Sequence, residues 1–173
     1  RKFLAVAFLA LGFAFTSNAQ KTVMVGGAAM YPNKNIIENA VNSKDHTTLV
    51  AAVKAADLVE TLKGKGPFTV FAPTNQAFQN LYTALNIEDI TDLPAPLVLD
   101  VLKYHVVEGR RAANSVVPKV NTRNISTLLG VNFTVNTQGV ITAVGNTSTI
   151  TNPNISASNG IIHVIDTVLL PIE

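Results

Sequence analysis

The stretch FTVFAPTNQAF, Phe68 to Phe78, is the most informative part of the chain about the fold, because it predicts a buried strand that turns directly into a helix. Its first half, Phe68–Ala72, is short, β-branched and aromatic, as is typical of a strand inside a sheet. Pro73 lacks the N–H group that a sheet ladder needs, so it ends the strand. Thr74 can accept a hydrogen bond from the first turn of a new helix. We interpret this corner as a folding device, since no reactive group lies in it.

Helical patterns precede the corner. Glu38 follows Asn35 by three residues, as in a capping box, so a helix is predicted to begin after Asn35. A second helical pattern starts near Thr47, where apolar residues recur at helical spacing. Asp57, with Glu60 three residues later, predicts another cap and a further short helix.

The second half of the chain changes from helical to strand patterns. A helical region follows Pro94 and Pro96, and it is predicted to run through residues 104–107 until Gly109 closes it. After about residue 118 apolar and polar residues alternate, and Asn159-Gly160 is a strong tight-turn pair. Helices followed by strands predict an α+β fold, not alternating βαβ units.

The first 19 residues have the pattern of an export signal. Two basic residues are followed by an apolar run over residues 3–15, and Ser17 and Ala19 provide small side chains before a cleavage point. A transmembrane anchor is the alternative, but the run is too short to span comfortably. We expect a signal peptide at 1–19, a lead-in at 20–34 and one domain at 35–171, in a protein that is secreted or periplasmic and not inserted in the membrane.

The charge and the missing cysteines exclude several function classes. The chain has 13 Lys and Arg and 11 Asp and Glu; removing residues 1–19 takes away two basic residues and leaves 11 − 11 = 0. A neutral chain with no Lys/Arg cluster in its sequence is a poor nucleic-acid binder. There is no cysteine, so disulfides, a thiol nucleophile and thiolate metal ligands are excluded. We expect no cofactor.

The histidines do not form a catalytic or metal-ligating pattern. His46, His105 and His163 are far apart in sequence, so no close ligand pair predicts a zinc site. His163 and Asp166 are three residues apart near a strand, which should place their side chains on opposite faces. An enzyme is therefore not expected.

Three separated stretches resemble the fasciclin (FAS1) domain family. GPFTVFAPTNQAF is similar to its first signature segment, YHVVEG at Tyr104–Gly109 to its central tyrosine-histidine motif, and ASNGIIHVIDTVLLP at Ala157–Pro171 to its second signature segment. The order matches the family, and the resemblance covers about residues 35–171. It implies a wedge-shaped β-sandwich with helices packed on it. One departure is Asn75, where many members have an acidic residue.

The resemblance implies a role in cell adhesion or extracellular-matrix contact, with a protein or polysaccharide partner. Tyr104 and His105 are the residues it points to for binding; the alternative is that Tyr104 packs in the core and His105 fixes a helix end. A second hypothesis is a carrier of a small lipophilic ligand such as a carotenoid. Four N-x-[ST] sequons could hold glycans, but strand and turn composition explains them as well. They begin at Asn124, Asn132, Asn146 and Asn154.

Overall fold

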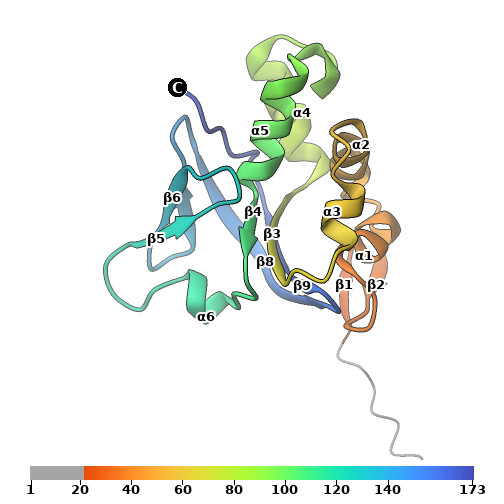
Figure 1. Ribbon diagram of the computed structural model, residues 1–173. Coiled ribbons are helices and arrows are strands. Elements are labelled where there is room, and N and C mark those ends of the chain that lie inside the picture. The colour runs from red at the N-terminus through yellow and green to blue at the C-terminus, as the bar shows by residue number, and fades with distance from the viewer. Residues whose placement is uncertain (1–21) are drawn as a thin grey trace, which may run out of the picture.

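The computed structural model describes residues 22–173 as a layer of helices packed on one part of a curled sheet. In Figure 1 the helices cover one side of the central strands β3 and β9, and the strands β5 and β6 stand away on the other side. This arrangement confirms the predicted α+β wedge. The expected signal peptide lies outside the described residues.

The helices are α1 (Ile36–Asn42), α2 (Thr47–Ala55), α3 (Val59–Lys63), α4 (Asn75–Leu85), a 3-10 turn η1 (Ile90–Asp92), α5 (Ala95–Tyr104) and α6 (Ala113–Val116). The strands are β1 (Val23–Val25), β2 (Ala28–Met30), β3 (Phe68–Pro73), β4 (Val106–Glu108), β5 (Arg123–Ser126), β6 (Asn132–Val135), β7 (Val140–Thr142), β8 (Thr147–Ala157) and β9 (Gly160–Ile165).

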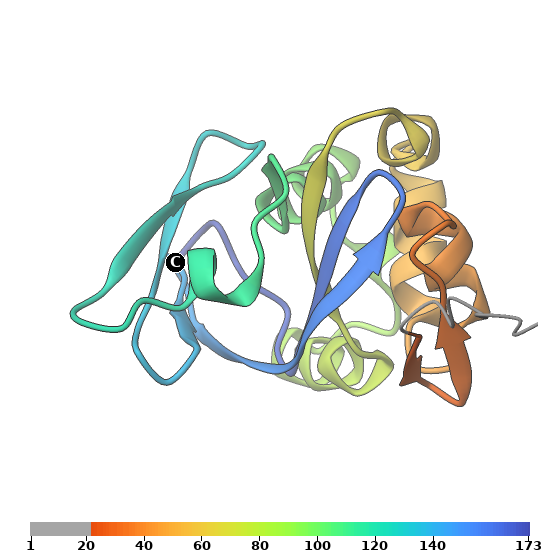
Figure 2. The ribbon, with the colours of Figure 1, turned by 90° about the horizontal axis from the view of Figure 1, so that it is seen from below.

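The main sheet has the strand order β4-β3-β9-β8-β7-β6-β5. Its pairs are antiparallel except β3 with β9, which run parallel from Phe68↔Gly160 to Pro73↔Ile165. The 11-residue strand β8 belongs to both halves, and its pairing with β9 shifts register twice, between Ile150 and Ile155. Such bulges bend a strand and increase its twist. Figure 2 shows β8 crossing from its hairpin with β9 to the β5–β7 half.

The strand-to-helix corner forms as its sequence predicts. Strand β3 ends at Pro73, and the hydroxyl of Thr74 accepts a hydrogen bond from the N–H of Ala77 at 3.2 Å. The capping box of α1 is also confirmed, with Asn35 and Glu38 exchanging two hydrogen bonds of 2.8 Å. Both features depend on residues within three positions of each other.

Strand β3 is buried on both faces, because it separates two hydrophobic clusters. Val70 and Ala72 face the cluster under the helices, whereas Phe71 faces an inner cluster enclosed by the curled sheet. The inner cluster consists of Phe71, Tyr104, Val107, Val116, Ile125, Phe133, Val135, Ile141, Ala143, Ile165 and Leu169. Because side chains alternate between the two faces of a strand, β3 contacts both clusters and so joins the two halves of the wedge.

The predicted lead-in contains ordered structure of its own. Strands β1 and β2 form an antiparallel hairpin from Val23↔Met30 to Val25↔Ala28. Val25 and Met30 are only 5% and 3% exposed and belong to the cluster under the helices. The hairpin is therefore packed against the domain core.

Two local predictions were wrong. Asp57 does not cap a helix: its φ is +57°, the residue before α3 is Leu58, and no side chain caps this helix. The helical region also ends at Tyr104 instead of continuing through Val107, because residues 106–108 pair with β3 as strand β4. Long-range strand pairing outweighed the local apolar pattern there.

Candidate functional site

Tyr104 lies at the end of α5, inside the inner cluster. Its side chain is 0% exposed, its ring meets the Phe133 ring edge to face with centroids 5.8 Å apart, and its hydroxyl donates to the carbonyl of Asn132 at 3.0 Å. Burial raises its pKa. The side chain thereby joins α5 to β6.

His105 is 2% exposed and connects three segments of the chain. The N–H of Leu169 donates to its Nε2 at 2.8 Å, so the ring proton is on Nδ1, which donates to the carbonyl of Val101 at 2.6 Å. The carbonyl of His105 accepts from the N–H of Phe71 at 2.9 Å. Burial lowers the pKa of His105 to about 4, so the ring is neutral at pH 7. In this structure neither side chain of the Tyr104–His105 pair can touch a partner directly.

His163 holds the loop that follows β4. The N–H of Asn154 donates to Nδ1 at 3.2 Å, so the protonated Nε2 donates to the carbonyl of Arg111 at 2.8 Å. Burial lowers the pKa of His163, and the Arg111 carbonyl partly opposes this. Asp166 instead accepts from the N–H of Thr149 at 2.9 Å. The two side chains have separate hydrogen-bond partners and do not pair with each other.

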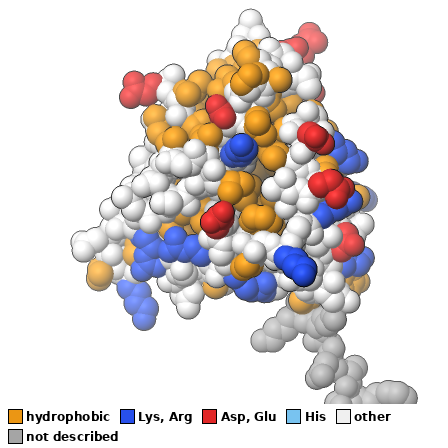
Figure 3. Space-filling model, viewed as in Figure 1, with side chains coloured by type: hydrophobic (Ala, Val, Ile, Leu, Met, Phe, Trp, Pro, Cys, Tyr) orange, Lys and Arg blue, Asp and Glu red, His pale blue; other side chains and the backbone are white. Residues whose placement is uncertain are grey.

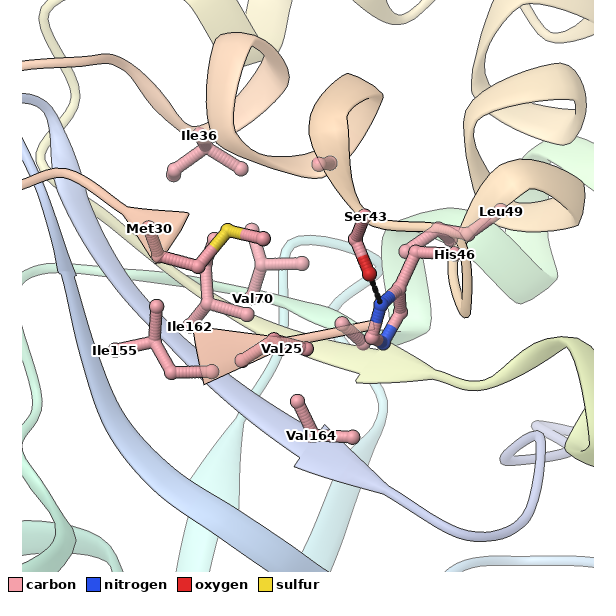
Figure 4. A pocket seen from close by; sticks show the side chains of 12 residues that line it. Val25, Met30, Ile36, Ser43, His46, Leu49, Val70, Ile155, Ile162 and Val164 are labelled. Carbon is pink, nitrogen blue, oxygen red and sulfur yellow. Dashed lines mark hydrogen bonds between the residues drawn. The ribbon is translucent and has the colours of Figure 1, made fainter. Parts of the chain in front are cut away.

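His46 borders an apolar pocket under the β1–β2 hairpin, which we call the His46 pocket (Figure 4). The ring is 3% exposed, and its Nδ1 lies 2.8 Å from the hydroxyl of Ser43, whereas its Nε2 has no hydrogen-bond partner. Burial lowers its pKa, while the Ala72 carbonyl, which is close to the ring but forms no hydrogen bond of good geometry with it, and the Asp45 carboxylate act in the opposite direction. The remaining lining is apolar and comes from Val25, Met30, Ile36, Ala40, Leu49, Val70, Ala72, Ile155, Ile162 and Val164. The cavity measures about 30 Å³.

A larger and more open cavity lies between the two ends of the sheet, where β4 and β5 are the edge strands. We call it the edge groove. It measures about 470 Å³ and is lined by Val107, Glu108, Arg111, Asn124, Ser126, Thr127, Leu128, Leu129 and Gly130. The N–H of Leu128 donates to the carbonyl of Val106 at 2.7 Å, which closes one end. Its exposed polar side chains can exchange hydrogen bonds with a partner.

The fold forms a charge cluster that the sequence did not reveal. Arg111 and Arg123 both donate to the carbonyl of Ser115, although the two arginines are 12 positions apart. Figure 3 shows Lys and Arg side chains gathered over the region of α6 and β5. The absence of a Lys/Arg cluster was a statement about the linear sequence; in the fold, Arg111 and Arg123 lie together although they are distant in the chain.

Asn75 ties the corner to the start of α2. Its Oδ1 accepts from the N–H of Thr48 at 3.0 Å, and its Nδ2 donates to the carbonyl of Lys44 at 2.8 Å. A carboxylate could make the first bond and not the second. The departure at this position thus has a structural use that the sequence did not indicate.

The sequons have mixed surroundings. Asn124 and Asn132 are exposed strand residues. Asn146 donates to the carbonyl of Val168 and accepts from the N–H of Leu170, and Asn154 accepts from the N–H of Ala113. For the last two, structural hydrogen bonds account for the asparagine.

The described part of the chain contains neither a cluster of metal-ligating side chains nor a membrane-spanning helix. Within residues 22–173, no group of three or more His, Asp or Glu side chains is placed to hold a metal ion. Over the same range, no helix combines the length and apolar character needed to cross a membrane.

Comparison with known proteins identifies relatives along most of the chain. The family model of the Fasciclin domain matches residues 44–171. Protein sll1483 of Synechocystis is 39% identical over 178 residues, which cover 98% of this chain and 94% of that protein. Immunogenic protein MPT70 of Mycobacterium tuberculosis is 38% identical over 137 residues, 76% of this chain and 66% of that protein.

Other relatives are longer than this chain. Transforming growth factor-beta-induced protein ig-h3 of Sus scrofa is 32% identical over 79% of this chain and 20% of its own length. A solved FAS1 domain pair from the insect cell adhesion molecule fasciclin I matches with a TM-score of 0.65, over 88% of this chain and 58% of that chain. At 16% identity this last likeness is one of fold. By the family match and its relatives, this chain belongs to the fasciclin domain family.

Proposed function

We propose that this protein is an exported, non-enzymatic adhesion module that binds a cell-surface or matrix protein or a polysaccharide of the cell envelope. The observation that carries the proposal is the edge groove, an open cavity of about 470 Å³ lined by both polar and apolar residues. It occurs in a domain that shares its fold with a cell adhesion molecule.

The groove has features that suit a binding surface. Edge strands offer backbone N–H and C=O groups, to which an extended partner can add hydrogen bonds. Glu108, Asn124 and Ser126 are exposed along the two edges and supply a carboxylate, an amide and a hydroxyl. These groups favour a polar partner.

Tyr104 and His105 contribute to this function, in our proposal, by positioning the groove. Tyr104 binds β6 through the Asn132 carbonyl, and His105 fixes the segment directly before β4. A change at either residue alters the spacing between the sheet edges without removing a direct contact.

An attachment assay tests the proposal. A surface is coated with the protein lacking residues 1–19, and attachment of the producing cells or of their extracted polysaccharide is measured against an inert protein of similar size. We expect attachment that Ser126→Tyr, which fills the groove, reduces strongly. Thr142→Tyr, at an exposed position on β7, is the matched control and should leave attachment unchanged. Attachment equal to the inert protein, or equal loss in both variants, would contradict the proposal.

A second candidate function is the carriage of a small lipophilic ligand, for which the apolar lining of the His46 pocket is the supporting observation. The partnerless Nε2 of His46 could bind a polar end group. A cavity of about 30 Å³ accommodates only a water molecule or two, so a carotenoid requires displacement of the β1–β2 hairpin. Solvent extraction of protein purified from its source tests this: a coloured or lipid extract supports it, and a clean extract contradicts it.

A further inference from the structure

The charges of this chain are divided between its two halves. From Gly109 to Glu173 there are four basic residues and two acidic residues, Asp166 and Glu173. The preceding residues 22–108 contain six Lys and nine Asp or Glu. In Figure 3 most acidic side chains on the visible face accordingly lie over the helical half. The β5–β9 half is therefore the side that attracts anions.

Within that half, two guanidinium groups meet at one carbonyl oxygen. Arg111 donates from Nη2 to the carbonyl of Ser115 at 3.0 Å and from Nε to the Ser115 hydroxyl at 3.1 Å. Arg123 donates from Nη1 to the same carbonyl and to that of Asn114. These bonds leave other N–H groups of both arginines available, since each guanidinium has five donors.

The positive charges of this pair are not neutralised by a neighbouring carboxylate. Within residues 22–173, the one ion pair closer than 4.0 Å joins Lys63 to Glu60 in α3. Burial and the charge of Arg123 both lower the pKa of Arg111, as expected for a cation held beside another cation. An anion bound at the pair would relieve this repulsion.

Buried polar residues hold the Arg111 loop in place. Thr69, which is 0% exposed, donates to the carbonyl of Gly109 at 2.6 Å and accepts from the N–H of Arg111 at 2.8 Å. His163, also 0% exposed, donates to the carbonyl of Arg111. Because the backbone is fixed on both sides, little backbone conformational entropy is lost when Arg111 binds a ligand.

The Arg111 side chain also lines the edge groove, where Asn124 and Ser126 stand on β5. Amide and hydroxyl groups suit sugar hydroxyls, and a guanidinium suits carboxylate or sulfate. Glu108 lines the same groove from β4, and its carboxylate repels an anion bound there. The described residues carry 10 basic and 11 acidic side chains. A nucleic acid has closely spaced negative charges and would be repelled by these acidic groups, so a polymer with widely spaced charges is the more suitable partner.

We propose that Arg111, with Asn124 and Ser126, forms a binding site for an acidic polysaccharide that carries carboxylate or sulfate groups, and that Arg123, which shares the Ser115 carbonyl with Arg111, adds positive charge beside the groove. This inference rests on the proposed adhesive function and names the chemical class of its partner. The alternative occupant of a basic surface on this molecule is the acidic helical half of a second copy.

Binding to three immobilised polymers tests the site. The probes are alginate, which carries carboxylates, dextran sulfate, and uncharged dextran as the blank. We expect the protein to bind at least one acidic polymer and not dextran, with affinity that falls as salt rises. Arg111→Gln should weaken binding about tenfold or more, as for a lost charge-assisted hydrogen bond. Lys54→Gln removes one positive charge at an exposed position on α2, away from the groove, and should have little effect on binding.

A second variant keeps the test decisive if Arg111→Gln is poorly folded. Glu108→Gln removes the opposing carboxylate and should tighten binding several-fold with the arginines intact. Equal weakening by Lys54→Gln and Arg111→Gln, no gain from Glu108→Gln, or a concentration-dependent dimer that Arg111→Gln abolishes, would overturn the inference. If cells attach to the coated protein but neither Arg111→Gln nor soluble acidic polymer reduces attachment, the adhesive function stands and this site fails.

Discussion

Single residues in this domain act mainly through hydrogen bonds that fix the backbone. Four side chains form a hydrogen bond with a main-chain group: those of Thr74, Asn75, His105 and His163. The residue type at these positions therefore depends on its donor and acceptor groups more than on its size. Substitutions that preserve volume and remove the donor or acceptor in use should be costly at these positions.

Replacing the helix cap at Thr74 gives a direct test at this scale. Thr74→Ala removes the acceptor for the Ala77 N–H and should lower the free energy of unfolding by about 1 kcal/mol. Thr83→Ala, in the same helix, removes only an exposed hydroxyl bonded to the Gln79 carbonyl and should change it by less than about 0.5 kcal/mol. Urea denaturation measures both, and equal effects would show that the cap contributes nothing.

His105 predicts a pH dependence of stability. Its pKa is about 4 in the folded protein and near 6.5 when unfolded, so between these values the unfolded chain binds the extra proton. The free energy of unfolding should fall as pH is lowered from 6.5 to 4, by on the order of 3 kcal/mol from this residue. His46 and His163, whose pKa values are also lowered, act in the same direction.

Denaturation at pH 7, 5.5 and 4.5 checks this dependence. His105→Gln keeps a donor and an acceptor and cannot titrate, so its curve against pH should be shallower, even if the variant is less stable at pH 7. Parallel curves for the two proteins would mean that His105 does not carry the effect.

At the scale of elements, a side chain at the start of one helix forms a hydrogen bond with a backbone N–H group at the start of another. Helix α2 begins after His46, which forms no side-chain cap, and its Thr48 N–H is instead satisfied by Asn75 from the start of α4. The corner at β3 and α4 therefore also sets the position of α2.

Variants of Asn75 separate the two bonds of this connection. Asn75→Ala loses both and should destabilise the fold by about 1–2 kcal/mol. Asn75→Asp keeps the acceptor for Thr48 and adds a charge that suits two helix N-termini, while it loses the bond to the Lys44 carbonyl. We expect it to lie between Asn75→Ala and the unchanged protein in thermal unfolding. If Asn75→Asp proved the least stable of the three proteins, this account would be contradicted.

At the scale of the whole molecule, one curled sheet joins two clusters. The helices cover the β3–β9 face, and strand β8 extends into the β5–β7 half, which encloses the second cluster. Its two edges meet at the groove for which we propose binding. The N-terminal hairpin closes the other side of the domain, over the His46 pocket.

Truncation of the hairpin tests how far it belongs to the domain. Removing residues 1–30 instead of 1–19 exposes the surfaces that Val25 and Met30 cover and should lower the free energy of unfolding by about 2 kcal/mol or more. It should also increase the fluorescence of a hydrophobic dye, since the pocket opens. Unchanged stability and no added dye binding would mean that the hairpin is an independent appendage.

The amino-acid pattern alone was enough to predict the corner at Phe68–Phe78, the capping box at Asn35 and the order of helices before strands, because each depends on residues close together in the chain. It predicted an α+β fold for the same reason, whereas the wedge shape was implied only by the family resemblance. It failed at Asp57 and at residues 106–108, where packing and strand pairing overrode local patterns.

The contents of the candidate site depend instead on contacts between distant parts of the chain. The bond from Leu169 to His105 joins residues 64 apart, and Arg111 meets Arg123 because the chain turns back through α6. Neither follows from a repeating pattern, since contacts between distant segments are set by how β8 bends and how the sheet closes. The sequence supplied the charges and the histidines, and the curl of the sheet determined which of them face a groove and which are buried.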